Sequence, residues 1–177
     1  MRVHKGMRPQ DVVVLLKVLL QANSSWRYTD LAAQLGLSQS EVSESLERSR
    51  IAGLIEPKKR RVFVSAFLEF LIHGLRYVFP AEPGPVVRGL PTAHSASPLL
   101  EKIVSKEVFV WPDERGQHSG QAIQPLYAGV ASAARQDARL YELLALVDAV
   151  RVGRSREKLL AQKEIEARLK ALANAAK

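Results

Sequence analysis

The spacing of apolar residues along the chain predicts a mainly helical protein. In residues 8–22 apolar side chains recur at three- and four-residue intervals, which places them on one face of a helix. The same spacing occurs over residues 137–150 and again from 155 to the C-terminus, so we expect two long helices there. Residues 66–79, AFLEFLIHGLRYVF, are apolar over more than one face. Such a helix has to be buried on several sides, by its own core or by a second subunit.

Two shorter helices are expected between the first helix and residue 52. Thr29 can cap the first of them, which ends at Gly36 because glycine readily adopts the left-handed conformation that terminates helices. Ser38 stands three residues before Glu41, which is the spacing of a capping box. A third helix is therefore predicted to begin at this serine.

Four consecutive cations, residues 58–61, lie between two short apolar runs at 54–56 and 62–64. Short apolar or β-branched runs on either side of a polar tip predict a small hairpin. Ser65 is then placed to cap the apolar helix that follows.

Residues 80–98 change the character of the chain, because they hold five of its nine prolines. Proline ends helices and cannot donate a hydrogen bond to a central strand, so we expect a linker or an ordered, extended loop. A helix is predicted to resume at Ser97, which is followed by Pro98. The run EVFVWP, residues 107–112, predicts a strand, and the DERGQ stretch after it predicts a turn.

The order helix, helix, tight turn, helix and basic hairpin is that of a winged helix-turn-helix domain. Residues 8–79 resemble the winged-helix domains of bacterial regulators such as the MarR family. The matching residues are Leu31, Ala32, Leu35, Gly36 and Leu37 for the first helix and the turn, Ser38, Val42 and Leu46 for the recognition helix, and AGLI at 52–55 for its exit. The resemblance implies a mainly α fold with a small β-wing, followed by a Pro-rich loop and C-terminal helices. The corresponding segments are residues 1–79, 80–130 and 131–177.

The resemblance also implies how such a domain binds DNA: the recognition helix, residues 38–52, enters the major groove, and the wing, residues 56–62, contacts the backbone or the minor groove. Glutamine can pair with adenine, serine with several bases or with phosphates, and glutamate with the amino group of cytosine. The residues carried over by position are Ser38, Gln39, Ser40, Ser43 and Glu44 in the groove, with Arg48 near the phosphates.

The predicted recognition helix departs from the family pattern in its charge. It carries Glu41, Glu44 and Glu47, and no Lys or Arg lies between Ser38 and Glu47. Capping explains Glu41, and Glu47 can face solvent, but Glu44 faces the polyanion. Phosphate neutralisation supplies most of the affinity for DNA, so the cations have to come from elsewhere. The expected source is Lys58, Lys59, Arg60 and Arg61, together with Arg48 and Arg50.

The net charge of +8 is unevenly distributed along the chain. Residues 1–64 carry +5, residues 65–130 carry −1, and residues 131–177 carry +4. An anionic partner that touches both terminal segments fits this distribution. Solvated helix faces account for it equally well, so the charge alone does not decide the function.

The middle segment holds four candidates for a sensor or partner site: Arg88, His94, Ser95 and Trp111. They could line a pocket for an anionic or aromatic ligand, although ordinary loop and packing roles are the simpler interpretation because their spacing specifies no ligand. The chain has no cysteine, and its four histidines lack the spacing of metal ligands, so we expect no metal and no cofactor. No phosphate-binding loop or nucleophile–base–acid arrangement occurs, and an enzyme is not expected.

These patterns together predict a dimeric, sequence-specific DNA-binding transcriptional regulator that acts by occupying an operator. The candidate dimer surface is the helices at 66–79 and 137–176, unless they only close the core of one chain. The functional alternative is a protein-interaction or antitoxin-like adaptor whose winged-helix scaffold has little sequence-specific DNA binding. No apolar run approaches the roughly 18 residues of a membrane span, and no export signal is visible. We therefore expect a cytoplasmic, nucleoid-associated protein.

Overall fold

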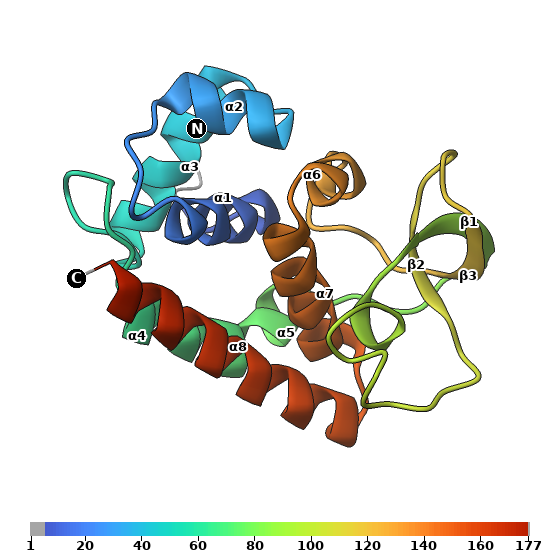
Figure 1. Ribbon diagram of the computed structural model, residues 1–177. Coiled ribbons are helices and arrows are strands. Elements are labelled where there is room, and N and C mark those ends of the chain that lie inside the picture. Colours follow the sequence, from blue (N-terminus) through green and yellow to red (C-terminus); the bar gives the residue numbers. More distant parts are fainter. Residues whose placement is uncertain (1–5, 177) are drawn as a thin grey trace.

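The first predicted helix, α1 (Pro9–Leu20), lies at the centre of the helical part of the molecule. The computed structural model describes residues 6–176 and is shown as a ribbon in Figure 1. Nine of the 12 residues of α1 are buried. The helix contacts four other helices: α2 (Tyr28–Leu35), α3 (Gln39–Ile51), α7 (Ala138–Val152) and α8 (Ser155–Ala175). Helix α1 therefore joins the N-terminal and C-terminal parts of the chain.

The two short helices predicted before residue 52 are present as α2 and α3. Helix α2 begins at Tyr28, so Thr29 lies in its first turn rather than at its cap. Gly36 ends this helix with φ of 64°, in the left-handed region. At the start of α3, the hydroxyl of Ser38 accepts a hydrogen bond from the backbone N–H of Glu41 (3.1 Å), whose carboxylate accepts one from the N–H of Ser38 (2.8 Å). The predicted capping box is confirmed.

Residues 56–61, here called the basic turn, connect α3 to the apolar helix. Among the described residues, one β-bridge, between Ile55 and Val62, flanks this turn, so the predicted hairpin is present in a shorter form. The apolar helix begins at Val64, one residue before the serine expected to cap it. It continues as three segments: α4 (Val64–Glu69), a π-helical turn (Phe70–Gly74) and α5 (Leu75–Val78).

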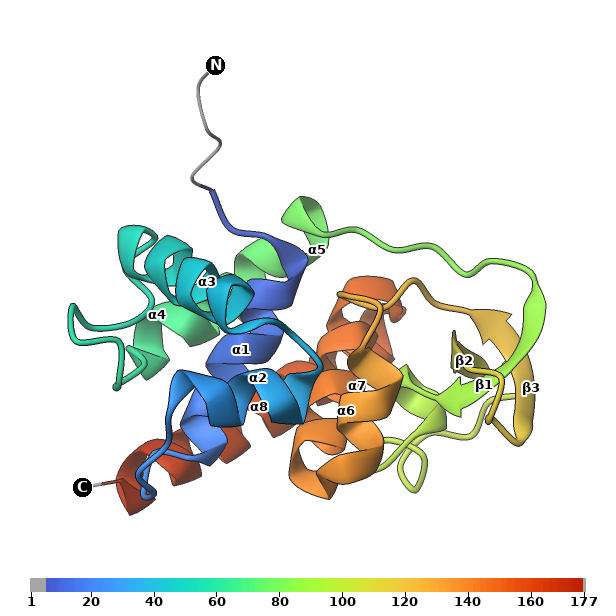
Figure 2. The same ribbon diagram turned by 90° about the horizontal axis from the view of Figure 1, so that it is seen from above.

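The proline-rich segment contains a central strand, which corrects the expectation of a loop or linker. Strand β1 (Val86–Pro91) pairs antiparallel with β2 (Phe109–Pro112) and with β3 (His118–Ala122), which pair with each other in parallel, so the three strands close on themselves. The prolines are compatible with this pairing because Pro85 precedes β1 and Pro91 is its last residue. The sheet lies on the side of α7 away from α1 (Figures 1 and 2).

The segments around the sheet differ from the prediction in two further places. No α-helix resumes at Ser97: a short 3-10 helix, Ala93–Ser95, is followed by turns over residues 97–102. Helix α6 (Val130–Gln136) was not predicted, because its alanine-rich sequence has no apolar periodicity. Helix α7 follows as expected, with the carboxylate of Asp137 accepting hydrogen bonds from the first N–H groups of the helix.

The C-terminal helices cover the apolar helix within a single chain. Helix α8 packs against α4 and α7, and Figure 1 shows it running along α4. Phe67, Leu71 and Leu75 are completely buried, so the closing of one chain's core accounts for their apolar character. One hydrophobic cluster extends from Val12 to Leu169, across the expected segment boundaries.

The described residues thus form a mainly helical fold, as predicted, with a small three-stranded sheet that lies in residues 86–122 and not at the predicted wing. None of the helices within residues 6–176 is both long enough and apolar enough to cross a bilayer.

Candidate nucleic-acid interface

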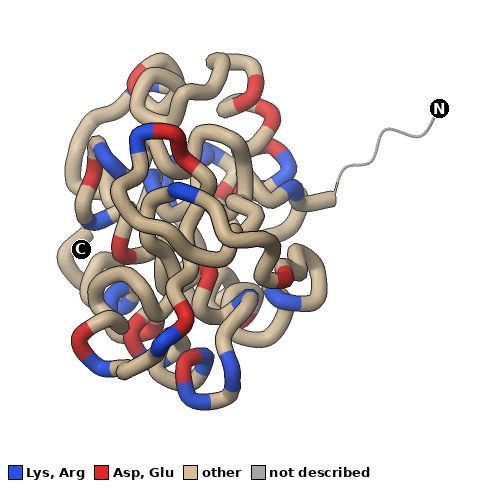
Figure 3. The backbone as a smooth tube through the Cα atoms, turned by 90° about the vertical axis from the view of Figure 1, so that its right-hand side faces the viewer, with Lys and Arg blue, Asp and Glu red and all other residues tan. Residues whose placement is uncertain are grey.

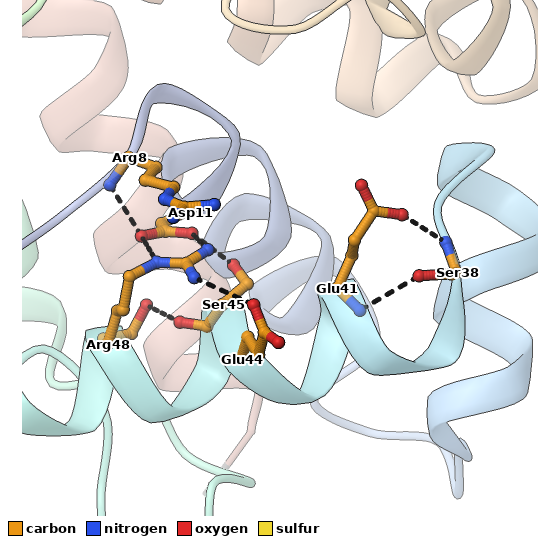
Figure 4. A network of polar contacts seen from close by, with 8 residues as sticks. Arg8, Asp11, Ser38, Glu41, Glu44, Ser45 and Arg48 are labelled. Carbon is orange, nitrogen blue, oxygen red and sulfur yellow. Dashed lines mark hydrogen bonds and ion pairs between the residues drawn. The ribbon is translucent and has the colours of Figure 1, made fainter. Parts of the chain in front are cut away.

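A buried carboxylate on α1 fixes the orientation of α3. Asp11 is fully buried and accepts hydrogen bonds from Nε (2.9 Å) and Nη2 (2.7 Å) of Arg48. The same carboxylate accepts one from the hydroxyl of Ser45 (2.7 Å) and one from the backbone N–H of Arg8 (2.8 Å). Figure 4 shows Asp11 enclosed by these three partners. One face of α3 is therefore held against α1, and the opposite face is presented to solvent by a rigid element.

Arg48, which the resemblance places near the phosphates of DNA, belongs to this buried cluster. Its side chain is only 8% exposed, and its hydrogen bonds to Asp11 raise the pKa of the guanidinium. The expectation is corrected: Arg48 holds α3 in place and is not available to DNA. The sequence carries no local sign of this role, because Asp11 lies 37 residues earlier in the chain.

The exposed face of α3 begins with the residues that the resemblance assigns to the groove. Ser38, Gln39, Ser40 and Glu44 are exposed, and Ser43 is partly exposed. The hydroxyl of Ser38 is engaged by the cap, as Figure 4 shows. Among the described residues, the other four side chains have no short hydrogen bond that would tie them to the fold; Glu44 lies 3.7 Å from the guanidinium of Arg48.

Glu47, further along α3, connects the helix to the basic turn. Its carboxylate accepts hydrogen bonds from Nη2 (2.6 Å) and Nε (3.0 Å) of Arg50, and Nζ of Lys59 lies 2.7 Å from Oε2. These contacts with Arg50 and then Lys59 lower the pKa of Glu47 to about 2. Glu47 is thus charged at neutral pH, and two cations offset its charge.

A second contact holds the other side of the basic turn. The guanidinium of Arg60 lies 4.2 Å from the ring centre of Trp26 and donates a hydrogen bond to its backbone carbonyl (2.7 Å). Tyr28 stacks with Trp26 at 6.1 Å between ring centres, and the same guanidinium lies 5.8 Å from the ring centre of Tyr28. A guanidinium on an aromatic face is favourable even at a partly exposed site. Arg60 therefore positions the turn.

Lys58, Arg60 and Arg61 are all exposed to solvent, but of these three only Arg60 is held against Trp26. Arg61 is 76% exposed, and its only recorded partner within the described chain is Glu56 at 3.6 Å, a weak surface pair. The four cations that looked alike in the sequence thus divide into two that hold the turn, Lys59 and Arg60, and two that face outward.

The remaining charge of the molecule does not locate an interface. On the side seen in Figure 3, Lys and Arg lie among Asp and Glu rather than in one block. Several cations of the C-terminal helices form ion pairs, for example Arg168 with Glu142 and Lys170 with Glu166. The +4 of residues 131–177 is therefore consistent with solvated helix faces, the alternative that the charge distribution left open.

The four candidates for a sensor or partner site do not lie together. Arg88 is exposed on β1, whereas His94, Ser95 and Trp111 are buried. His94 is hydrogen-bonded through Nε2 to the carbonyl of Glu107 (2.8 Å), and Ser95 accepts a hydrogen bond from the N–H of Phe109 (2.9 Å). A cleft of 410 Å³ borders Ser95 and another of 160 Å³ borders His94, but neither is lined by Arg88 or Trp111. The hypothesis of one pocket is corrected in favour of packing roles for the three buried residues.

Trp111 belongs to a second buried polar cluster, centred on Asp148 of α7. The carboxylate of Asp148 accepts hydrogen bonds from Nε1 of Trp111 (2.6 Å), the hydroxyl of Thr92 (2.9 Å) and Nη1 of Arg151 (2.7 Å). Burial raises the pKa of Asp148, and these three donors act in the opposite direction. Arg151 also donates to the backbone carbonyl of Phe79 (2.9 Å). The cluster joins the sheet to the helices.

Two further observations complete the description of the site. Within residues 6–176, no group of three or more His, Asp or Glu side chains is arranged to hold a metal ion. Comparison of the chain with protein-family models, with curated proteins and with solved structures found no match. Among the described residues, α3 and the basic turn are therefore the features that bear on function.

Proposed function

We propose that residues 8–79 form a winged helix-turn-helix unit that binds duplex DNA sequence-specifically, and that the protein regulates transcription by occupying an operator. In this proposal α3 enters the major groove and the basic turn lies on the adjacent backbone. The observation that carries it is the contrast between the two faces of α3. One face is fixed to α1 by the Asp11–Arg48 contact, and the other presents uncommitted polar side chains.

The exposed side chains suit the reading of base edges. Gln39 and Ser43 are four residues apart, so they lie on one face of α3, and Ser40 is next to them. The major groove admits a helix, and amide and hydroxyl groups pair with base edges there. A helix that is held rigidly by buried contacts can present such groups in a fixed register.

The basic turn supplies the charge that α3 lacks. Lys58 and Arg61 face solvent, while Arg60 and Lys59 anchor the turn to Trp26 and Glu47. Contacts between cations and phosphates release counterions, which supplies much of the affinity of DNA-binding proteins. A turn held on both sides loses little conformational entropy when it binds.

The proposal is tested by selecting duplexes from a random library and measuring their binding by fluorescence anisotropy over a series of salt concentrations. The variant Lys58→Glu/Arg61→Glu removes the two outward cations. We expect the slope of log K against log salt to become shallower by about 1.8, because two phosphate contacts are lost. The matched control, Lys106→Glu/Arg156→Glu, makes the same change of charge at two exposed residues outside the interface and should retain most of the binding. Equal losses in the two variants would contradict the assignment of the basic turn.

The reading of bases by α3 has a separate test. Gln39→Ala should relax the preference at one base pair and cost about 1–3 kcal/mol of discrimination, with little effect on binding to unrelated duplexes. A variant that binds every duplex more weakly, by the same factor, would instead place Gln39 on the backbone.

A protein partner is the second candidate, and the exposed carboxylate of Glu44 favours it. If the selection recovers no preferred duplex and the wild-type chain binds no DNA at low salt, the sequence-specific proposal fails and the adaptor role takes its place. Glu44→Ala separates the possibilities within a DNA-binding protein. A changed base preference would show that Glu44 reads a base, and tighter binding to every duplex would show that it limits non-specific affinity.

The resemblance to MarR-like regulators implies that two copies of the chain bind together to a palindromic site. Because α4, α5, α7 and α8 cover one another within a single chain, a dimer surface has to use their outer faces. Tyr77 at the end of α5 is 78% exposed and Val78 is 51% exposed, so this end is the candidate. A dimeric mass by light scattering at micromolar concentration would support this part of the proposal, and a monomeric mass would contradict it.

A further inference from the structure

Arg50 and Lys59 together bind an anion that belongs to the same chain, the carboxylate of Glu47. The guanidinium of Arg50 donates hydrogen bonds to the two carboxylate oxygens of Glu47 at 2.6 and 3.0 Å, and the ammonium of Lys59 lies 2.7 Å from one of them. A guanidinium fork and an ammonium group are also the donors that bind phosphate oxygens in proteins. We propose that Arg50 and Lys59 form a phosphate-binding site, which Glu47 occupies in the free protein and leaves when duplex DNA binds.

The position of the site supports this assignment, which rests on the proposed function of α3 and the basic turn. Arg50 comes from the last turn of α3, and Lys59 comes from the basic turn beside Lys58. Their side chains are 40% and 21% exposed, so an external anion can reach them. The site thus lies where the helix in the groove and the turn on the backbone would meet the same DNA strand.

The backbone of Lys59 is consistent with a functional constraint. Lys59 has φ of 58°, in the left-handed region that a residue with a side chain seldom adopts. Its N–H donates a hydrogen bond to the carbonyl of Glu56 (2.8 Å), which closes the turn. Backbone conformations of this kind persist where surrounding contacts hold them, commonly at functional sites. Here the conformation places the ammonium group over α3.

The consequence for binding follows from the charges. With Glu47 in place, the three side chains carry a net charge of +1; with the carboxylate turned into solvent, the two cations present +2 to the DNA. Every duplex has to displace Glu47, whatever its sequence. Only a duplex that also makes base contacts with α3 recovers that free energy. Glu47 therefore lowers the affinity for every duplex by the same factor, so that at a given protein concentration only a duplex with additional base contacts stays bound.

The experiment compares Glu47→Gln with Glu101→Gln. Both variants remove one negative charge from the surface of the protein, but the exposed Glu101 lies in the middle segment, outside α3 and the basic turn. We expect Glu47→Gln to bind a random-sequence duplex about tenfold more tightly at low salt, with a salt slope steeper by about 0.9–1.8. Glu101→Gln should change the affinity by no more than about twofold and leave the slope nearly unchanged, because it frees no cation of the proposed site.

A third variant identifies the cations. Adding Arg50→Gln and Lys59→Gln to Glu47→Gln should abolish the gain in affinity. Thermal unfolding of each variant shows that the comparison is made on folded protein. The proposal is overturned if Glu47→Gln binds the random duplex no more tightly than Glu101→Gln, or more weakly than wild type. Either result would show that Glu47 only attaches the basic turn to α3.

Failure of this inference is distinguishable from failure of the proposed function. If the wild-type chain binds no duplex, the proposed function fails, and the anion site is tested with heparin as the polyanion. The salt concentration that elutes Glu47→Gln from immobilised heparin should then exceed that for Glu101→Gln. Equal elution of the two variants would overturn the anion site as well.

Discussion

The start of α3 and the strands of the middle segment hold polar side chains in opposite ways. On α3, Gln39 and Ser40 lie on the surface of a helix that other residues keep in place. Around the sheet, Ser95 and Trp111 are buried, and their polar atoms form the hydrogen bonds that keep the segment folded. The polar side chains of α3 are thus available to a partner because other residues secure the helix, whereas those around the sheet are occupied in securing the fold.

The same difference appears within the candidate interface. Arg48 and Arg50 are two residues apart on α3, yet one is buried against Asp11 and the other is 40% exposed beside Glu47. Arg60 and Arg61 are adjacent and both exposed, yet Arg60 is packed on Trp26 and hydrogen-bonded to it, whereas Arg61 has only a weak pair with Glu56. Predictions that separate stability from DNA binding test this division directly.

The largest effect is expected at Arg48. Arg48→Met removes the cation from a buried pair and leaves Asp11 with two partners, Ser45 and the N–H of Arg8. The free energy of unfolding, measured by denaturant titration, should fall by about 3–5 kcal/mol. The control Arg50→Met, at an exposed pair, should cost less than about 1 kcal/mol. An unchanged stability for Arg48→Met, with a shallower salt slope of DNA binding, would return Arg48 to the interface.

A smaller loss is expected at Thr92, which tests the middle segment. Thr92→Val keeps the shape of a fully buried side chain and removes its hydrogen bond to Asp148. The loss of one of the three donors to this buried carboxylate should cost about 1–3 kcal/mol of unfolding free energy. At temperatures where the variant is folded, its affinity for DNA should equal that of wild type. A loss of DNA affinity without a loss of stability would mean that the segment contributes to the interface.

Ser38 and Ser40, two positions apart, allow the same substitution to be compared at a capping residue and at an exposed residue. Ser38→Ala removes the N-cap hydrogen bond to Glu41 and should lower the free energy of unfolding by about 1 kcal/mol. Ser40→Ala, at an exposed position, should stay within about 0.5 kcal/mol of wild type. When both variants are folded, Ser40→Ala should weaken DNA binding more than Ser38→Ala does. If Ser40→Ala is the more destabilising variant, side chains on the exposed face of α3 also contribute to the stability of the fold.

The smallest effect is expected in the dependence of stability on pH. Arg50 and Lys59 lower the pKa of Glu47 to about 2, from a usual value of 4.5. The carboxylate therefore binds its proton at a lower pH in the folded protein than in the unfolded chain. Its stabilising contribution is complete above about pH 4.5 and is lost as the pH falls towards 2. The stability difference between wild type and Glu47→Gln should therefore shrink over this range. An NMR titration of the Glu47 side chain with a midpoint near 4.5 would contradict the contact.

The sequence predicts those parts of the fold that depend on neighbouring residues. The apolar periodicity identified α1, α7 and α8, and the spacing of Ser38 and Glu41 identified the start of α3. Helix α6 is not predicted, because its alanines give no strong difference in hydrophobicity between the faces of the helix. Strand β1 is not predicted, because proline is ordinarily excluded from a central strand; here Pro85 precedes β1 and Pro91 is its last residue.

The candidate site was predictable only in outline, because its decisive contacts join residues far apart in the chain. The pair Arg48–Asp11 spans 37 residues and Arg60 reaches Trp26 across 34. Nothing near Arg48 distinguishes it from an exposed arginine, and no local feature separates Lys58 from Lys59. The exception is Glu47 with Arg50, whose spacing of three on a helix is the usual one for an ion pair.

The central place of α1 has a consequence for how the molecule unfolds. Since the helix packs against both α3 and the C-terminal helices, residues 8–79 cannot lose their structure without exposing the surface that covers α7 and α8. The chain holds two tryptophans, Trp26 near the basic turn and Trp111 in the sheet. Single-tryptophan variants therefore report on the two ends of the core, and we expect their fluorescence transitions in denaturant to coincide as one cooperative event. Two separate midpoints would mean that the interface region melts on its own.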